Sequence, residues 1–226
     1  GMKERVDEPI LNGMKLVGGV AVGKTYLYYG PFHGIEIKEE KIPADKISVE
    51  MERFNGACKD VEEFNRQKSM QVEEKYGQDS IIAGISRGFN TILMEMMPKV
   101  VKMIEAEHVN AEFAVQKVFM PVVNELKEGN IDGAKQFEVD YEGVMADLIR
   151  CLSGKHPERL TDLVEEDVVL IADRIHPQDA LSIKGNVKAI VLQIGGAASH
   201  GAIIARKMDI PAIQIDQVME RVGAGK

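Results

Sequence analysis

The spacing of apolar residues divides the chain into three parts. Between about residues 44 and 152, apolar side chains recur at alternating steps of three and four, which is the spacing of amphipathic helices. The clearest of these stripes comprises Ile47, Met51, Phe54, Cys58 and Val61. Because about four such segments follow one another with short connections, this part of the chain predicts an antiparallel helical bundle.

The parts on either side have the pattern of β-strands. Residues 14–29 are rich in Val, Leu and Tyr and are interrupted by glycines, which predicts strands joined by a tight turn, and a further strand candidate covers about 33–42. VVLIA at 168–172 and VKAIVLQI at 187–194 are near-continuous apolar runs, typical of strands covered on both faces. PAIQI at 211–215 predicts another strand.

Two residues set local expectations inside the helical part. Asn110 stands directly before an apolar stripe, where a side-chain oxygen can cap a helix. Pro121 lies within that stripe and has no amide hydrogen, so it should kink or divide the helix.

Composition narrows the class of protein. The 226 residues carry a net charge of −8 with no basic cluster, which disfavours a nucleic-acid partner. No apolar run approaches the ~18 residues of a membrane span, and no basic-then-apolar leader opens the chain, so we expect a cytoplasmic protein. Cys58 and Cys151 lie in helical patterns, which favours buried thiols over a disulfide or a metal pair.

The negative charge is concentrated in the helical part. Residues 41–150 hold 14 Lys and Arg against 20 Asp and Glu, a net of −6. This excess fits a solvated helical surface, and it also fits a docking face for a carrier protein with basic groups.

One short stretch offers chemistry, IGGAASHGAIIAR at 194–206. Gly195 and Gly196 permit backbone angles closed to other residues and leave room for a partner. Ser199 is placed to cap the following helix, so His200 falls in its first turn, where free amide hydrogens and the helix dipole favour an anion and a neutral imidazole. A neutral imidazole is a nucleophile that can hold a phosphoryl group as a phosphoramidate. The same spacing also fits an ordinary polar residue at a helix start.

Other uses of the histidines fit the sequence less well. A Ser–His hydrolase dyad is disfavoured because adjacent residues at a helix start point in different directions. A metal site needs further ligands, and none lies at a suitable local spacing. The remaining histidines are scattered, as expected of surface or turn residues: His33, His108, His156 and His176.

The stretch GGAASHGAIIARKMDIPAI at 195–213 resembles the phosphohistidine motif of the phosphoenolpyruvate-utilising enzymes. That motif runs Gly-Gly, two variable residues, Ser or Cys, His, a small-residue helix ending Ala-Arg, and a short link to Pro-Ala. Within this family the chain resembles the N-terminal domain of Enzyme I of the bacterial sugar phosphotransferase system at 12–24, 50–54, 109–115 and 168–177. Pyruvate phosphate dikinase and phosphoenolpyruvate synthase lack a helical insert at this place.

The resemblance implies a fold and a division of the chain. It implies an α/β phosphohistidine (swivelling) domain, discontinuous in sequence, formed by residues 1–42 and 153–226. An all-α helical-bundle subdomain, residues 43–152, is inserted into it and docks a histidine-containing phosphocarrier protein.

The resemblance also implies a phosphotransferase activity. His200 would accept phosphate from phosphoenolpyruvate and pass it to the phosphocarrier protein. Phosphoenolpyruvate and Mg²⁺ would bind a C-terminal domain beyond Lys226, so we expect the N-terminal half of a longer protein, with no cofactor or metal of its own and no activity on phosphoenolpyruvate alone. Within this motif, Ser199 would cap the helix and contact the phosphate, Gly195 and Gly196 would shape the loop, and Arg206 would support the phosphate charge.

The chain departs from the Enzyme I pattern at three places. Ala197 and Ala198 stand where the family has Arg-Thr, so polar contacts to phosphate are lost. The loop after Pro177 lacks the threonine that orients the histidine ring; Asp179 could accept that hydrogen bond or could cap a turn. Residues 81–98 and 133–137 differ from the docking helices of the family.

These departures leave two further functions open. One is a swivelling phosphohistidine domain that serves small-molecule transfer, as in the dikinase and the synthase. The other is a binding module that holds the phosphocarrier but no longer transfers phosphate.

Overall fold

A computed structural model of the protein describes residues 13–19, 23–30, 35–129, 134–154, 166–176, 179, 183, 185–195 and 199–223. By their contacts the residues form two compact units. One comprises Gly1–Gly30, Glu166–Ile175 and Lys184–Lys226, and the other comprises Pro31–Glu165 and His176–Ile183. Each unit is described by itself below.

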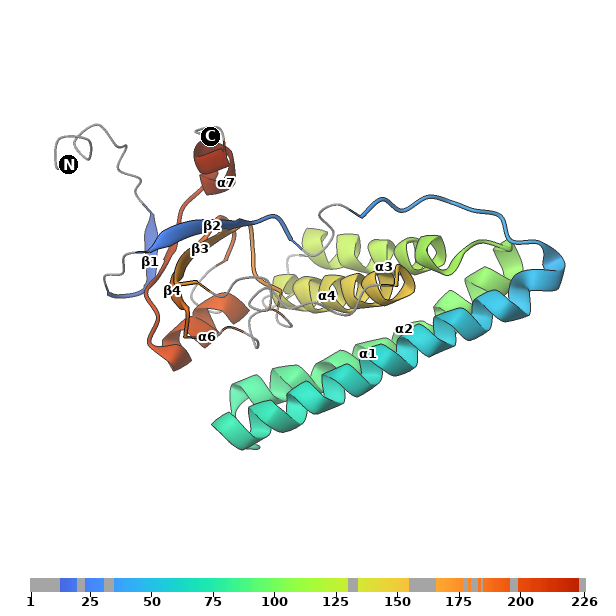
Figure 1. Ribbon diagram of the computed structural model, residues 1–226, viewed down its shortest axis with the longest axis horizontal. Helices are drawn as coiled ribbons and strands as arrows, with labels where there is room; N and C mark the ends of the chain where they lie inside the picture. Colours follow the sequence, from blue (N-terminus) through green and yellow to red (C-terminus); the bar gives the residue numbers. More distant parts are fainter. Residues whose placement is uncertain are drawn as a thin grey trace. The chain divides into compact units, whose positions relative to one another are not determined.

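The first unit is an α/β unit around one five-stranded sheet (Figure 1). Its strands are β1 (Met14–Val17), β2 (Lys24–Tyr28), β3 (Val168–Ala172), β4 (Val187–Leu192) and β5 (Ala212–Gln214). The strand order is β1-β5-β4-β3-β2. The four strands β2, β3, β4 and β5 run parallel, and β1 is antiparallel to β5. The three C-terminal strands lie where the apolar runs predict them.

The prediction of a tight turn within residues 14–29 is wrong. β1 and β2 both form, but they occupy opposite edges of the sheet, β1 beside β5 and β2 beside β3. Gly19, just after β1, has φ 144°, and a Cβ there would come within 2.6 Å of Pro211 Cγ. This close passage beside the start of β5 requires a glycine at position 19, so Gly19 reflects packing and not a hairpin.

Helices cover both faces of this sheet. Gly201, in α6 (His200–Met208), lies against Leu192 of β4. The next residue back along that strand, Val191, packs with Ile171 and with Val218 of α7 (Val218–Gly223). Because successive side chains of a strand point to opposite faces, α6 and α7 cover opposite faces of the sheet.

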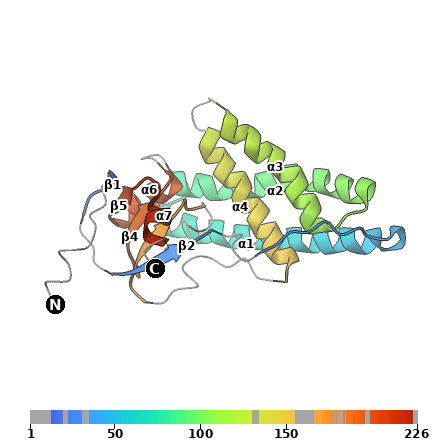
Figure 2. The same ribbon diagram turned by 90° about the horizontal axis from the view of Figure 1, so that it is seen from above.

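The second unit is a bundle of four helices, as predicted (Figures 1 and 2). A short 3₁₀ turn η2 (Ala44–Lys46) leads into α1 (Ile47–Tyr76), α2 (Ile81–Glu107), α3 (Ala111–Glu128) and α4 (Ala134–Leu152). α1 lies along α2 and α3 lies along α4, each as an antiparallel pair. α3 is not divided at Pro121 but runs through it as one helix.

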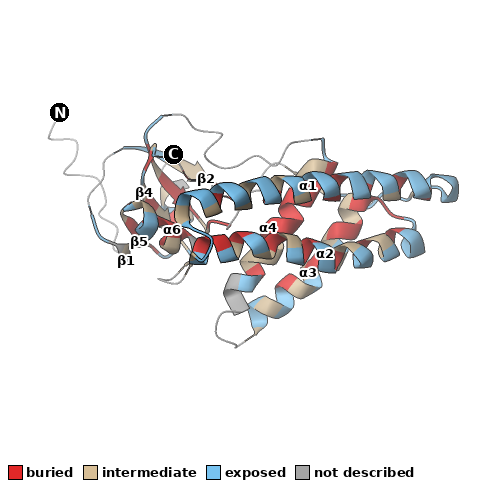
Figure 3. Cartoon of the chain, turned by 90° about the horizontal axis from the view of Figure 1, so that it is seen from below, coloured by how far each residue is buried: buried red, intermediate tan, exposed pale blue. Residues whose placement is uncertain are grey.

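The core of the bundle is formed by the predicted apolar stripes. Figure 3 shows buried residues on the facing sides of the helices and exposed residues on the outer sides of α1 and α2. The largest fully buried side chains here include Phe54, Leu93, Met96, Phe119 and Leu148. None of the helices in the described part of the chain combines the length and the apolar content that a bilayer span requires.

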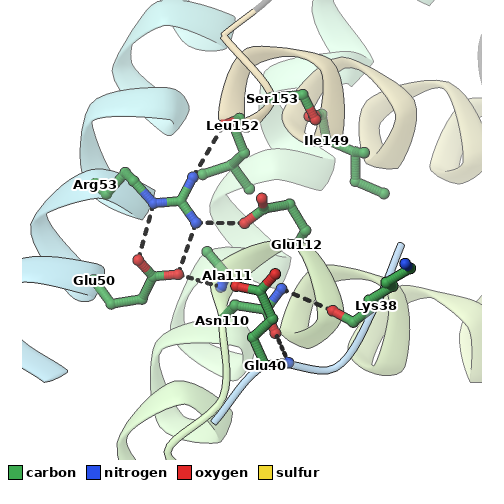
Figure 4. Close-up of polar contacts among 10 residues, drawn as sticks. All are labelled: Lys38, Glu40, Glu50, Arg53, Asn110, Ala111, Glu112, Ile149, Leu152 and Ser153. Atoms are coloured by element: carbon green, nitrogen blue, oxygen red, sulfur yellow. Dashed lines mark hydrogen bonds and ion pairs between the residues drawn. The ribbon is translucent and has the colours of Figure 1, made fainter. Parts of the chain in front are cut away.

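Residues 35–42, within the further strand candidate at 33–42, do not form a strand in the described structure. Residues 35–40 are neither helix nor strand, and Lys41 makes an isolated bridge to Val109. Asn110 takes the backbone groups instead: its side-chain oxygen accepts from Glu40 N at 2.9 Å, and its side-chain nitrogen donates to Lys38 O at 3.0 Å (Figure 4). The Asn110 side chain thus binds two backbone groups of this segment, beside the backbone bonds from Asn110 N to Glu40 O and from Ile42 N to His108 O.

The same contacts overturn the prediction that Asn110 caps α3 with its side chain. Asn110 does occupy the N-cap position, but its side chain makes no capping bond. Glu50 of α1 supplies the cap, because its carboxylate accepts from Ala111 N at 2.7 Å. The helix start is thus stabilised from a residue 61 positions away in sequence.

Arg53 joins this cap to the end of α4 (Figure 4). Its guanidinium donates to both oxygens of Glu50, to Glu112 near the start of α3, and to Leu152 O at the end of α4. The hydrogen bond from Arg53 holds the pKa of Glu50 below its usual value of 4.5, opposed by burial and assisted by the Ala111 amide. Because Glu50 lies in the first turn of α1, one ion pair joins the starts of α1 and α3 and the end of α4.

Substituting Glu50 should test this dependence. We expect Glu50→Gln to lower the free energy of unfolding at pH 7 by about 1.5–3 kcal/mol, since it removes the charge from bonds to Arg53 and Ala111. The matched control is Glu63→Gln, which removes an exposed ion pair with Arg66 on the same helix and should cost about 0.5 kcal/mol or less. If urea unfolding showed an equal loss of unfolding free energy in the two variants, this role of Glu50 would be contradicted.

The pH dependence of stability supplies a second readout of the same group. A carboxylate whose pKa is lowered in the folded state stabilises that state above its usual pKa, and this stabilisation is lost as pH falls through the lowered value. The difference in stability between the wild-type chain and Glu50→Gln should therefore shrink below about pH 4.5. A stability difference between the two chains that stays constant from pH 7 to pH 3 would contradict a lowered pKa of Glu50.

The chemistry of Cys58 gives a prediction for the core. Burial raises the pKa of this thiol to about 12, with smaller contributions from Cys151 and Glu62. Because the thiolate is the reactive form, a maleimide at pH 8 should not modify Cys58 in the folded chain and should modify it in urea. The measurement uses Cys151→Ser, and rapid labelling of that variant without denaturant would contradict the prediction.

Candidate functional site

The site begins where β4 ends at the carboxyl edge of the sheet. Gln193 N donates to Ala172 O at 2.9 Å and Ile194 N donates to Asp173 O at 2.7 Å, both at the end of β3. The chain after Leu192 is therefore fixed for two further residues. The carboxyl edge of parallel strands is where α/β sheets bind ligands.

Gly195 turns the chain away from the sheet. Its φ is +151°, and a Cβ at this position would lie 3.2 Å from Ser199 Oγ and 3.3 Å from Leu192 Cδ1. Both the backbone angle and the close approach require a glycine, so the prediction that Gly195 shapes the loop has a physical basis here. Gly196, Ala197 and Ala198 lie outside the described residues, and their roles stay predictions.

Ser199 caps α6, as the sequence predicts. Its φ and ψ of −67° and 155° are extended, and its Oγ accepts from Ala202 N at 3.3 Å. Its carbonyl accepts from Ile203 N at 2.9 Å. The cap fixes where the helix begins, and therefore fixes His200 as its first residue.

His200 thus stands at the amino end of a nine-residue helix. Free amide hydrogens and the positive end of the helix dipole favour an anion at this end. The described structure includes the backbone of His200 but not its side chain, so the orientation of the imidazole stays a prediction.

Gly201 is a site residue that the sequence analysis missed. A Cβ there would lie 3.1 Å from Leu192 Cδ1 and 3.7 Å from Ile175 Cβ. The absence of a side chain at Gly201 therefore lets the first turn of α6 lie close against the sheet. A glycine inside a small-residue helix was the available signal, because glycine otherwise weakens a helix.

The two other predicted site residues are Arg206 and Asp179. Arg206 is exposed in the last turn of α6, about 9 Å along the helix from His200 at 1.5 Å per residue, where a positive charge also favours the carboxyl end of the helix. Asp179 is buried in the segment His176–Ile183, which groups with the helical bundle. Contact of either side chain with phosphate or imidazole stays a prediction.

His176 contradicts the expectation of a surface or turn residue. It is 4% exposed, and its Nε2 lies 3.0 Å from Oε1 of Glu142 on α4. The pairing partner is 34 residues away, so local sequence could not indicate it. His108 does occupy a turn, as the left-handed C-cap of α2, whereas His33 and His156 lie outside the described residues.

The described residues do not gather into a metal centre. No group of three or more His, Cys, Asp or Glu that could hold a metal ion occurs in the part of the chain that the structure describes. The site described above therefore consists of a backbone turn, a capped helix start and one histidine.

The helical bundle presents apolar side chains to solvent. Five large apolar residues on α1, α2 and α4 are more than half exposed: Val49, Met70, Ile81, Met94 and Phe137. Together with the net charge of −6 over residues 41–150, they give the bundle a surface that is both acidic and partly apolar.

Family models match most of the chain. The model of the phosphoenolpyruvate-utilising enzyme N-terminal region matches residues 12–130, more than half of the chain. The model of the phosphoenolpyruvate-utilising enzyme mobile domain matches residues 164–220, which include His200.

Curated relatives agree with these models. The chain is 29% identical to a phosphoenolpyruvate-protein phosphotransferase of Enterococcus faecalis, over 96% of this chain and 37% of the relative. It is 28% identical to the phosphoenolpyruvate-protein phosphotransferase of Bacillus subtilis, over 90% of this chain and 35% of the relative. The chain thus spans little more than a third of the length of these relatives.

Solved structures share the fold. A solution structure of Enzyme I is 28% identical and matches with a TM-score of 0.70, covering 94% of this chain and 85% of that one. The N-terminal domain of a protein described as Enzyme 1 - Nitrogen is 17% identical with a TM-score of 0.59, over 91% of this chain and 83% of that one, a likeness of fold. The resemblance predicted from the histidine motif is confirmed: the chain belongs to the phosphoenolpyruvate-utilising enzymes and has the fold of the Enzyme I N-terminal domain.

Proposed function

We propose that this chain is the phosphoryl-transfer part of an Enzyme I-like phosphotransferase. His200 accepts a phosphoryl group from phosphoenolpyruvate that is bound on a separate C-terminal domain, and passes it to a histidine-containing phosphocarrier protein in the cytoplasm. One observation carries the proposal: His200, inside the matched mobile-domain segment, is the first residue of a capped helix at the carboxyl edge of a parallel sheet.

The chemistry consists of two transfers at one nitrogen. A neutral imidazole nitrogen of His200 attacks phosphorus, the bond from phosphorus to the enol oxygen breaks, and enolpyruvate leaves to become pyruvate after protonation. A histidine nitrogen of the carrier then attacks the same phosphorus, and the nitrogen–phosphorus bond to His200 breaks. The helix start favours both the neutral imidazole and the negative phosphoryl group.

The surrounding residues have supporting roles in this proposal. Ser199 holds the helix start and reaches the phosphate, and Gly195 and Gly196 leave room for the donor and the carrier. Arg206 offsets phosphate charge, and Asp179 accepts a hydrogen bond from the imidazole. The methyl side chains of Ala197 and Ala198 offer no polar contact to the phosphate. The helix start therefore contributes more of the phosphate binding here than it would beside a loop with polar side chains.

The metal and the carrier are assigned to different surfaces. We assign Mg²⁺ to the phosphoenolpyruvate-binding domain and no metal or other cofactor to this chain, as the family resemblance implies. We place the carrier on the helical bundle, whose acidic and partly apolar surface suits a partner with basic groups around an apolar centre.

A second candidate is a module that binds the carrier without transferring phosphate. Ala197 and Ala198 favour it, because they remove the hydroxyl and guanidinium contacts that the family motif supplies. The two candidates differ in one measurable property, the formation of a phosphorylated chain.

Labelling of His200 tests the proposed transfer. The chain is incubated with ³²P-phosphoenolpyruvate, Mg²⁺ and the C-terminal part of a related phosphotransferase, or with ³²P-labelled phosphocarrier protein alone. We expect acid-labile label on the wild-type chain, and its loss in His200→Ala. Asn110→Ala, which removes bonds in the bundle and none in the unit that holds His200, is the control and should still be labelled from phosphoenolpyruvate.

Two results would contradict the proposal. Label that persists in His200→Ala places the phosphate elsewhere. A wild-type chain that binds the carrier, in a titration followed by NMR, but never takes label from either donor supports the second candidate instead.

The turn at Gly195 gives a separate prediction. Gly195→Ala should slow labelling and lower the free energy of unfolding by about 1–3 kcal/mol, because a Cβ at φ +151° is strained and crowds Ser199 Oγ. Gly185→Ala, before β4, is the matched control, since no atom lies within 4 Å of a Cβ there. Labelling of Gly195→Ala at the rate of Gly185→Ala would show that the turn does not position the site.

A further inference from the structure

Gln193 connects the approach to the histidine loop with two other segments of the α/β unit. Its side-chain Oε1 accepts from Met219 N in α7 at 3.0 Å. Its Nε2 donates to Asp173 Oδ1, after β3, at 3.4 Å. Its own backbone N donates to Ala172 O at 2.9 Å. One residue at the end of β4 is thus held by the end of β3 and by the start of α7.

The bond to Met219 has a physical reason. The first amide hydrogens of a helix have no partner within the helix and need an acceptor from elsewhere. The side-chain oxygen of Gln193 is the acceptor for Met219 N in α7. Moving this side chain away would leave the Met219 amide without that hydrogen bond. Asp173 is itself held, since Arg174 Nε lies 3.6 Å from its other oxygen.

The location of these bonds matters for the histidine. Ile194 N is also bonded, to Asp173 O at 2.7 Å, and the turn at Gly195 follows directly. These hydrogen bonds lie at the root of the loop that leads to Ser199 and His200. A change in the course of the backbone at this root would alter the direction in which the loop leaves the sheet.

We propose that Gln193 is a positioning residue for phosphoryl transfer: it sets the direction in which the loop leaves the sheet, and thereby the placement of His200. This inference rests on the proposed function of His200. In-line transfer is sensitive to displacements of about 1 Å, so a loosened root lowers the rate without removing the nucleophile.

A set of three variants separates the two side-chain bonds. Gln193→Leu keeps the approximate size and removes both. Gln193→Glu keeps an acceptor for Met219 N but places a carboxylate against Asp173. The double variant, Gln193→Glu with Asp173→Asn, restores a hydrogen bond between positions 193 and 173. Its direction is reversed, because the amide at 173 now donates to the carboxylate at 193.

We expect Gln193→Leu to take phosphate from ³²P-labelled phosphocarrier protein about tenfold more slowly at saturation, the change that about 1.4 kcal/mol produces, with an unchanged KM for the carrier. Gln193→Glu should also be slow, and the double variant should recover most of the rate. Rates are measured at a temperature at which circular dichroism shows every variant folded.

The NMR signals of the His200 ring give a readout that requires no phosphate. In the 226-residue chain alone, ring ¹³C and ¹⁵N signals of His200 should shift in Gln193→Leu and return in the double variant. The control is Asn186→Ala, at the opposite end of β4, which removes a bond to Glu166 O of 3.1 Å. It should lower stability and leave both the ring signals and the rate unchanged.

The outcomes separate this inference from the proposed function. A wild-type chain that takes no phosphate contradicts the proposed function, and the ring signals then decide whether Gln193 positions His200. Unchanged ring signals in Gln193→Leu, an unchanged rate, a double variant no better than Gln193→Glu, or an equal loss of rate in Asn186→Ala would each overturn the inference.

Discussion

The candidate site depends on the pairing of β3 and β4 at their carboxyl ends. Ala172 and Leu192 are partners in the parallel ladder, and the hydrogen bonds continue beyond the strands through Gln193 and Ile194. The loop therefore leaves the sheet from a fixed point. The turn at Gly195 follows directly from that point, and the first turn of α6 packs against Leu192 and Ile175.

The helical bundle depends on a different constraint, the burial of a charged group that must be paired. Glu50 is only 8% exposed, and a carboxylate so placed is tolerated because Arg53 and the Ala111 amide satisfy it. The same guanidinium reaches Leu152 O, so the starts of α1 and α3 and the end of α4 are joined. A bundle held in this way can present an exposed acidic and apolar surface without losing its own shape.

The sequence predicted those features whose cause is local. VVLIA coincides with β3, the apolar stripes coincide with α1 to α4, and Ser199 caps α6 because an N-cap needs only a side chain and an amide three residues on. The motif around His200 identified the family, since its spacing is specific. None of these features requires knowledge of distant residues.

The sequence failed where the cause lies far along the chain. The cap of α3 comes from Glu50, the partner of His176 is Glu142, and β1 pairs with β5 instead of β2. The roles of Gln193 and Gly201 also depend on distant contacts, with Met219 and with Leu192 respectively, which the sequence alone does not show. The imidazole of His200 and residues 196–198 lie outside the described residues, so their predicted roles rest on the motif.

The central claim is that the phosphoryl group resides on His200 and on no neighbouring residue, and Ser199 is the group against which it must be tested. The chain is labelled by phosphorylated carrier protein, digested at neutral pH, and the peptide spanning residues 188–206 is sequenced by electron-transfer mass spectrometry. The account predicts one phosphate on His200 that is lost in mild acid and stable in alkali. An acid-stable phosphate on Ser199, with His200 unmodified, would contradict it.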